Sequence, residues 1–248
     1  MEEYEPSTYG DRIAPIYDEM IEGKFDTDGA VSFLAELAAT GPVLELGIGT
    51  GRVALPLAQR GLEVHGIDTS EAMVEALRAK PGGDGIAITL KDFVDVDVEG
   101  QFSLVYVVFN TLFALVEQDD QVRCFRSVAQ RLTPNGVFVL EAFVPDLARF
   151  GRYHQRVEAG DLSLDRVRLE VSRHDPVTQR IHGQHVVISE EGTKLYPVQL
   201  RYSWPSELDL MARLAGLRLR ERWGSWRRDA FNESSERHIS VYGRSGQE

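Results

Sequence analysis

The sequence predicts an α/β fold built on a mainly parallel sheet with helices on both faces. Short apolar runs alternate with helical patterns between Gly41 and about Phe150. A glycine-rich turn joins the first of these runs to a helix. The run from Phe102 to Phe109 is almost continuously apolar, which is typical of a central strand buried on both faces. Strands that alternate with helices imply βαβ crossovers and therefore a parallel sheet.

The region from residue 41 to residue 150 contains five expected strands and three expected helices. Ser70 is placed to cap the second helix, which Pro81 and Gly82 end. Thr133-Pro134-Asn135-Gly136 predicts a turn before the fifth strand. The expected strands are 43–46, 63–68, 86–91, 102–109 and 137–143, and the expected helices are 51–60, 70–80 and 118–132.

The segments on either side of this region have other patterns. Residues 9–20 and 28–39 predict two helices ahead of the first strand. Residues 164–172, 181–189 and 194–202 alternate polar and apolar side chains, which predicts an antiparallel meander. A helix at 206–215 and strands at 217–223 and 238–242 complete the chain. We expect a single domain with a helical cap (1–40), a core (41–150), an antiparallel insertion (151–204) and a last part of the core (205–248).

Composition narrows the classes of partner and location. The chain of 248 residues has 27 Lys and Arg against 39 Asp and Glu, a net charge of -12. Nucleic-acid binders usually need a basic face, so no nucleic-acid partner is expected. The one cysteine, Cys124, cannot form an internal disulfide and fits a helix-packing position. The acidic N-terminus does not resemble a signal peptide, and the longest apolar run is too short to cross a membrane. We therefore expect a cytoplasmic protein with no membrane partner.

A glycine loop follows the first strand and opens a helix. It reads Glu45-Leu46-Gly47-Ile48-Gly49-Thr50-Gly51-Arg52. Glycines at such a turn allow a tight bend and let a ligand approach the backbone. Asp68 stands at the tip of the second strand, where its carboxylate can accept both hydroxyls of a ribose. Together they predict a nucleoside-cofactor site at the carboxyl ends of parallel strands.

The details of the loop distinguish between nucleoside cofactors. A dinucleotide fingerprint, G-x-G-x-x-G, would have glycine where Arg52 stands, and here the third glycine comes one residue early. Glu45 lies two residues before the first glycine, where it would repel a pyrophosphate and suit a cation. S-adenosylmethionine carries an ammonium and a sulfonium and no phosphate. The loop therefore favours S-adenosylmethionine.

Residues 43–146 resemble the class I S-adenosylmethionine-dependent methyltransferases. The resemblance implies a Rossmann-like, seven-stranded mixed sheet of order 3-2-1-4-5-7-6, with N-terminal helices and an antiparallel insertion after strand 5. It places Asp92 on the adenine amino group, Phe93 against the ring and Phe109 beneath the transferring methyl. The residues expected at the cofactor are Tyr9, Tyr17, Glu45, Gly47, Gly49, Gly51, Asp68, Thr69, Met73, Asp92, Phe93 and Phe109.

The meander and the N-terminal helices are similar to those of small-molecule methyltransferases from antibiotic and amino-sugar pathways. Sugar-amine enzymes of that kind tend to carry a histidine in the loop after strand 4. Here the loop reads Asn110-Thr111-Leu112-Phe113-Ala114-Leu115, without a histidine, and it lacks the Asn-Pro-Pro-Tyr signature of nucleic-acid amine methylases. This loop therefore does not support an amine acceptor. We expect a small-molecule acceptor that is methylated on O or N, and the sequence leaves open which atom, O, N, C or S, accepts the methyl group.

A hydroxyl or carbon acceptor would need a general base, whereas a neutral amine would not. The candidates are Tyr17, His154 and Tyr202, in segments expected to close over the mouth of the site. Glu141, at the end of the fifth strand, either faces the pocket or accepts a hydrogen bond from nearby backbone. Among the other histidines, we expect His65 at a packing or edge position and His238 at the surface.

No metal site is predicted, because the histidines of the meander lack metal-ligand spacing and a cysteine partner; they are His174, His182 and His185. Alternative functions are a nicotinamide-dependent oxidoreductase, a non-catalytic cofactor-binding module, and methylation of a protein or an RNA. An exposed edge of the meander could pair with a second copy of the chain, so a homodimer is possible.

Overall fold

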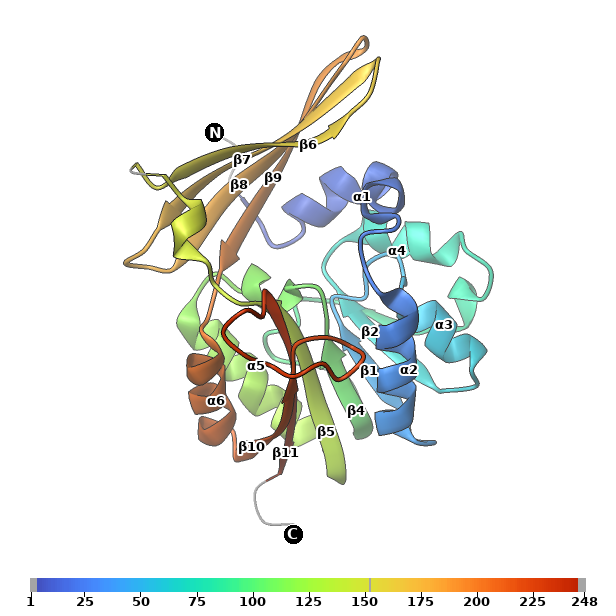
Figure 1. Ribbon diagram of the computed structural model, residues 1–248. Coiled ribbons are helices and arrows are strands. Elements are labelled where there is room, and N and C mark those ends of the chain that lie inside the picture. The colour runs from blue at the N-terminus through green and yellow to red at the C-terminus, as the bar shows by residue number, and fades with distance from the viewer. Residues whose placement is uncertain (1–3, 152, 245–248) are drawn as a thin grey trace.

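Two separate β-sheets and the helices around them make up the computed structural model of the chain, which describes residues 4–151 and 153–244 (Figure 1). The larger sheet has the order β10-β11-β5-β4-β1-β2-β3. Its strands are parallel except β11, which runs antiparallel to both β5 and β10. This confirms the predicted order, with β10 as strand 6 and β11 as strand 7.

The elements of the larger sheet and its helices follow the predicted succession closely. The strands are β1 (Val43–Leu46), β2 (Val64–Asp68), β3 (Ala87–Leu90), β4 (Phe102–Val107), β5 (Leu132–Phe143), β10 (Leu217–Trp223) and β11 (Arg237–Arg244). The α-helices are α1 (Thr8–Ile21), α2 (Thr27–Ala38), α3 (Ala54–Gln59), α4 (Glu71–Arg78), α5 (Gln118–Arg131) and α6 (Pro205–Leu214). Short 3₁₀ turns occupy η1 (Gly83–Gly85), η2 (Thr111–Ala114) and η3 (Leu147–Arg149).

Alternation along β1 divides the core into two layers. Leu44 and Leu46 face the apolar cluster formed with α5 and α6, whereas Val43 faces the cluster formed with α2 and α3. All four residues of β1 are buried, as expected for a central strand covered by helices on both faces. Cys124 of α5 lies in the first cluster and is fully buried, which confirms its role in packing.

Two expectations about the larger sheet were wrong. The predicted turn at residues 133–136 lies within β5, where the pairing with β4 shifts between Phe102 and Leu104. The extra residues of β5 form an irregularity next to Phe102. The two backbones are close there, because a Cβ added to Gly136 would lie 2.8 Å from the Phe102 carbonyl oxygen. His238 was expected at the surface because it opens the last strand, but it is fully buried, since it pairs with Ala142 of β5 and lies beside the Phe231 ring.

The insertion forms a second sheet of order β6-β7-β8-β9. Three of its strands match the predicted meander: β7 (Arg166–Asp175), β8 (Arg180–Ser189) and β9 (Gly192–Arg201). The fourth, β6 (Gln155–Leu162), was missed because most of its residues are exposed and show no alternation. Figure 1 shows this sheet projecting beyond the core sheet, with α1 between it and α4.

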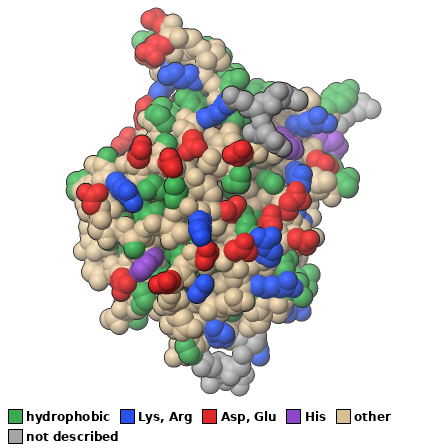
Figure 2. All heavy atoms as spheres, turned by 180° about the vertical axis from the view of Figure 1, so that it is seen from behind, with side chains coloured by type: hydrophobic (Ala, Val, Ile, Leu, Met, Phe, Trp, Pro, Cys, Tyr) green, Lys and Arg blue, Asp and Glu red, His purple; other side chains and the backbone are tan. Residues whose placement is uncertain are grey.

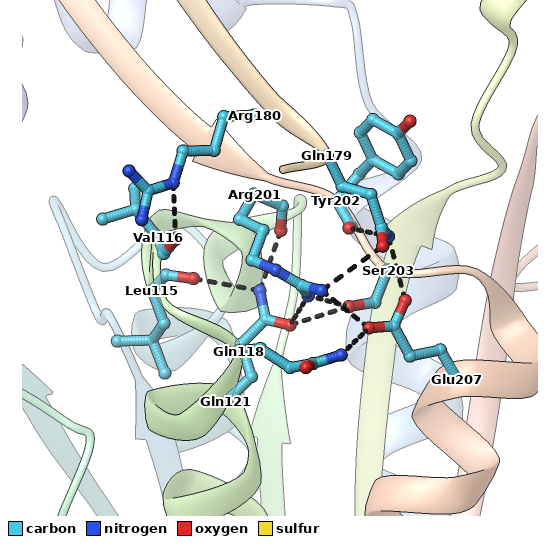
Figure 3. A network of polar contacts seen from close by, with 10 residues as sticks. All are labelled: Leu115, Val116, Gln118, Gln121, Gln179, Arg180, Arg201, Tyr202, Ser203 and Glu207. Atoms are coloured by element: carbon cyan, nitrogen blue, oxygen red, sulfur yellow. Dashed lines mark hydrogen bonds and ion pairs between the residues drawn. The ribbon is translucent and has the colours of Figure 1, made fainter. Parts of the chain in front are cut away.

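The insertion is attached to the rest of the molecule by apolar packing and by polar contacts, and Ile181 and Leu200 pack against the core cluster. Ile13 of α1 packs with Met73 of α4 and Tyr196 of β9. At the other end of β9, the buried Arg201 guanidinium donates to Glu207 Oε1 at 2.8 Å and to Gln121 Oε1 at 3.0 Å (Figure 3). These contacts join the insertion to α5 and α6. No helix among the described residues is long and apolar enough to cross a bilayer.

Candidate functional site

The glycine loop lies between the ends of β1 and β2. Gly47, Gly49 and Gly51 all have positive φ angles, of 70°, 54° and 78°. A side chain at Gly47 would meet Thr111 Cγ2 at 2.4 Å, and one at Gly51 would meet Leu77 Cδ1 at 2.9 Å. Gly49 has nothing within 4 Å of its would-be Cβ, so its backbone borders open space.

Asp68 is tied to the glycine loop by its carboxylate. Oδ2 accepts from the Gly49 backbone N–H at 2.7 Å, and Oδ1 accepts from the Ser70 N–H at 2.9 Å. Burial raises the pKa of Asp68, and the backbone donors oppose that rise. The two hydrogen bonds fix the carboxylate at the tip of β2, as its position in the sequence predicted.

Glu45 lies beneath the loop, away from open space. Its side chain points toward the α2 and α3 face, and its Oε2 accepts from the Tyr106 hydroxyl at 2.9 Å. Burial raises the pKa of Glu45 to about 8, with nearby Arg52 opposing the shift. A cation bound above the loop would favour its ionised form.

A cavity of about 470 Å³ opens over the glycine loop and extends to the underside of the insertion. Ten of the twelve predicted cofactor residues line it; Glu45 and Gly51 do not. A Cβ at Gly51 would instead meet Leu77 and Leu55. The ten are Tyr9, Tyr17, Gly47, Gly49, Asp68, Thr69, Met73, Asp92, Phe93 and Phe109.

The loop after β4 has an unusual backbone. Phe109 and Asn110 are consecutive non-glycine residues with φ angles of 57° and 65°. Glu141 Oε2 accepts from the Phe109 N–H at 3.0 Å, and Asn110 Oδ1 accepts from the Phe143 N–H at 2.7 Å. Left-handed conformations in side-chain-bearing residues cost energy and persist where their surroundings hold them. Glu141 therefore accepts from nearby backbone and from Trp226 Nε1 at 3.1 Å, and it also borders a cavity on the β5 side, so both expected roles apply.

The N-terminal helix covers the cavity with two tyrosines. Burial raises the pKa of Tyr17 to about 12 and that of Tyr9 well above its ordinary value. Both hydroxyls are therefore protonated at neutral pH and can donate hydrogen bonds. Asp11 Oδ1 accepts from the Ser70 hydroxyl at 2.6 Å, which fixes α1 to the beginning of α4.

The other two predicted base candidates lie in an aromatic cluster outside the cavity. Tyr202 is 2% exposed, and its hydroxyl is 3.0 Å from His174 Nε2. The His154 ring is 6.1 Å from the His174 ring, which stacks on Phe150 at 4.7 Å. Neither side chain lines the cavity, whereas Tyr17 does.

Sequence reasoning missed the part of the cavity formed by the insertion. Glu170 of β7 and Gln184 and His185 of β8 line it from the side opposite the glycine loop. Alternation along β8 was the available signal, because Ile181, Gly183 and His185 share one face. Without the fold, nothing in the sequence placed that face over the glycine loop.

A second cavity of about 840 Å³ adjoins the first. The two share Phe109, Asn110, Phe143, Arg149 and Arg156 in their linings. The second cavity therefore reaches the loop after β4 from the β5 side. Among the residues that the structure describes, no group of three or more metal-ligating side chains comes together.

The comparisons with known proteins agree with this geometry. Residues 43–136 match the model of a methyltransferase domain. The solved CcbJ methyltransferase from Streptomyces caelestis is 43% identical, with 98% of this chain and all of that chain covered and a TM-score of 0.92. The chain belongs to the S-adenosylmethionine-dependent methyltransferases.

Two further relatives place this methyltransferase among enzymes of similar size. The cypemycin N-terminal methyltransferase of a Streptomyces species is 25% identical over 96% of this chain and 98% of the relative. The sugar N-methyltransferase KedS8 from Streptoalloteichus has the same fold, with a TM-score of 0.68, 18% identity, and 99% of each chain covered. The family therefore favours methyl transfer over the nicotinamide-dependent alternative.

The cavity has the chemistry that S-adenosylmethionine requires. The backbone at Gly49 is open to a ligand, and Asp68 is held beside it. Phe93 offers an apolar surface, and Asp92 lines the cavity beside it in the chain. A nucleoside with a cationic tail fits a lining of this kind.

Proposed function

We propose that the 470 Å³ cavity binds S-adenosylmethionine along the ends of β1, β2 and β4, and that the acceptor enters from the insertion side. Asp68 would accept from the ribose, Asp92 and Phe93 would hold the adenine, and Tyr17 would close over the tail. The observation that carries this proposal is the continuity of one cavity from the glycine loop to the insertion. The cofactor supplies an electrophilic methyl group when bound.

The acceptor that we propose is an amine nitrogen of a small molecule. The cypemycin relative is named for methylation at an N-terminus, which is an amine. Glu170, on the insertion side of the cavity, supplies a negative charge that would attract an ammonium. A hydroxyl acceptor is the alternative outcome of the test below.

A nucleic-acid acceptor is disfavoured by charge. The net charge is -12, and acidic and basic side chains are interspersed over the face in Figure 2. Within the basic segment near the C-terminus, Arg222 pairs with Asp209 and Arg227 pairs with Asp26. We also propose that the chain works as one cytoplasmic methyltransferase domain; the single buried cysteine is compatible with a reducing compartment.

A calorimetric titration with S-adenosylmethionine, S-adenosylhomocysteine and NADH tests the cofactor assignment. We expect micromolar binding of the two sulfur compounds and none of NADH. Asp68→Ala should weaken binding roughly tenfold to a hundredfold, because hydrogen bonds to a charged group are lost. Asp97→Ala, which removes an exposed carboxylate, is the matched control and should bind normally. NADH binding alone, or no binding, would refute the assignment.

The acceptor is tested by release of S-adenosylhomocysteine with matched pairs of compounds. One pair is D-glucosamine and D-glucose, and another is a tripeptide with a free or an acetylated N-terminus. Turnover only with the amine of a pair supports nitrogen as the acceptor. Turnover with the neutral partner would show a hydroxyl acceptor instead.

Self-association through the insertion is part of the proposal. Strand β6 is an edge of its sheet and exposes Val157 and Leu162 by 66% and 79%. Unpaired edges can pair with a second copy. Sedimentation should show a dimer that Val157→Lys dissociates, and a wild-type monomer would contradict it.

A further inference from the structure

Glu170 and His185 face each other across neighbouring strands of the insertion. They are direct partners in the β7–β8 register, and His185 Nδ1 lies 3.6 Å from Glu170 Oε1. Nδ1 is buried and has no hydrogen-bond partner among the described residues. An unpartnered buried polar atom is costly, so its presence on a residue that lines the cavity indicates a functional role.

The cavity offers no other imidazole. Of the six histidines, His185 alone lines either cavity. Tyr17 lines it too, but burial raises its pKa to about 12, which leaves no phenolate at neutral pH. The loop after β4 supplies no histidine, so the insertion brings one from a different element to the same cavity.

The surroundings of His185 favour a neutral ring. Burial lowers the pKa of His185, and Glu170 opposes that shift while Arg168 and Lys24 support it. Tyr9 of α1 faces the ring, at 6.3 Å between centroids, and Tyr196 is its partner in β9. A neutral imidazole with Nδ1 directed at a carboxylate has its Nε2 lone pair available as a proton acceptor.

We propose that His185, oriented by Glu170, takes the proton of the acceptor amine before methyl transfer, an inference that rests on the proposed function. An amine is protonated near pH 7 and cannot attack in that form. One N–H bond of the ammonium breaks, and its electron pair stays on the nitrogen as the lone pair that attacks. The proton forms a bond to Nε2 of His185, and the imidazolium later releases it to water. Glu170 stabilises the imidazolium, and their 3.6 Å separation would shorten as the charge forms.

The first test needs no acceptor. Nitrogen-15 NMR of the full chain, saturated with S-adenosylhomocysteine, reports the tautomer and the titration of His185. We expect the neutral ring to carry its proton on Nδ1, and Glu170→Gln to lower the pKa of His185, because a stabilising negative charge is removed. A proton on Nε2, or a titration that Glu170→Gln leaves unchanged, would overturn the proposal.

The second test uses the amine that turns over among the matched pairs. His185→Gln should lower kcat about a hundredfold at neutral pH and move the fall in rate to higher pH, toward the ionisation of the free amine, without changing the affinity for S-adenosylmethionine. Glu170→Gln should move that fall to lower pH. His182→Gln, an exposed change on the same strand, is the control and should resemble wild type.

The outcomes distinguish a failure of the His185 base from a failure of the proposed function. Normal cofactor binding and amine turnover with an unaltered pH profile in His185→Gln would reject the base and keep the proposed function. Failure of the wild type to bind S-adenosylmethionine would reject the proposed function itself.

Discussion

The two sheets of this methyltransferase are stabilised in different ways. The core sheet is buried between two helical layers, and β1 has no exposed residue. The insertion sheet exposes apolar side chains such as Val157 and Leu195 by 66% and 51%. It is held at one end by the Arg201 network and along part of one face by α1. The core therefore depends on apolar packing, whereas the position of the insertion depends on a few specific contacts.

This difference corresponds to a division of roles. The glycine loop and Asp68 are fixed by the core, while Glu170 and His185 reach the cavity from the insertion. Small changes in how the insertion docks would move its side chains relative to the glycine loop and Asp68, which the core holds in place. We expect substitutions in the core to change the affinity for the cofactor, and substitutions in the insertion to change the turnover of the acceptor.

The largest expected effect is on core packing. Phe138 is fully buried in β5 and lies 5.2 Å from the Phe125 ring. Phe138→Ala should lower the free energy of unfolding by about 4 kcal/mol, from lost burial and a cavity. Val171→Ala, at a partly exposed site of the insertion, should change it by less than about 1 kcal/mol. Denaturant titration measures both, and equal losses would refute the contrast.

The next effect concerns docking of the insertion. Arg201 and Glu207 form a salt bridge with side-chain exposures of 7% and 17%. Arg201→Met should cost about 3 kcal/mol, because it leaves a largely buried carboxylate without its partner. Arg180→Met, which breaks the more exposed pair with Glu117, should cost less than about 1 kcal/mol. If the Arg201 variant lost stability but kept full turnover, the docking role would be wrong.

The smallest of the three effects is a pH dependence located in the core sheet. Burial lowers the pKa of His238 from 6.5 to about 3. The unfolded chain therefore takes up this proton before the folded chain as the pH falls, so the stabilisation present near pH 7 is lost between about pH 6.5 and 3. Between pH 7 and 5 the free energy of unfolding should fall by about 2 kcal/mol from this group.

The matched variants decide whether that loss belongs to His238. His238→Gln should flatten the pH dependence of stability, whereas His182→Gln, at an exposed insertion site, should leave it unchanged. An unaltered slope in His238→Gln would mean that other groups cause the loss.

The core could be predicted because its patterns are local. Apolar runs with helical segments between them identified β1 to β5, and the glycine loop with Asp68 indicated the cofactor end of the sheet. Strand β6 escaped prediction because its side chains are mostly exposed, so burial imposed no alternation on them. His238 was misplaced although the position of its strand was expected, because the exposure of a strand's first residues depends on the segments that cover them, here the loop that carries Phe231.

Prediction of the cavity from the sequence had the same limit, because local patterns could be recognised and contacts between distant segments could not. Its glycine-loop side was predictable from spacing, because consecutive elements bring those residues together. Its insertion side needs the β7–β8 register and the docking of the whole sheet, and both depend on distant contacts. His154 and Tyr202 were proposed from their neighbourhood in sequence, whereas the fold turns both toward His174.

Glu141 accepts a hydrogen bond from the Phe109 backbone, and Trp226 in turn donates to Glu141. The conformation of the loop after β4 therefore depends on residues that lie far from it in the sequence. The glycine loop lies within residues 43–136, but Glu141 and Trp226 both lie outside that stretch. A fragment limited to those residues would carry the recognisable motif and lose the restraints on the loop after β4. Minimal versions of this enzyme therefore have to keep the C-terminal strands, even though no motif marks them.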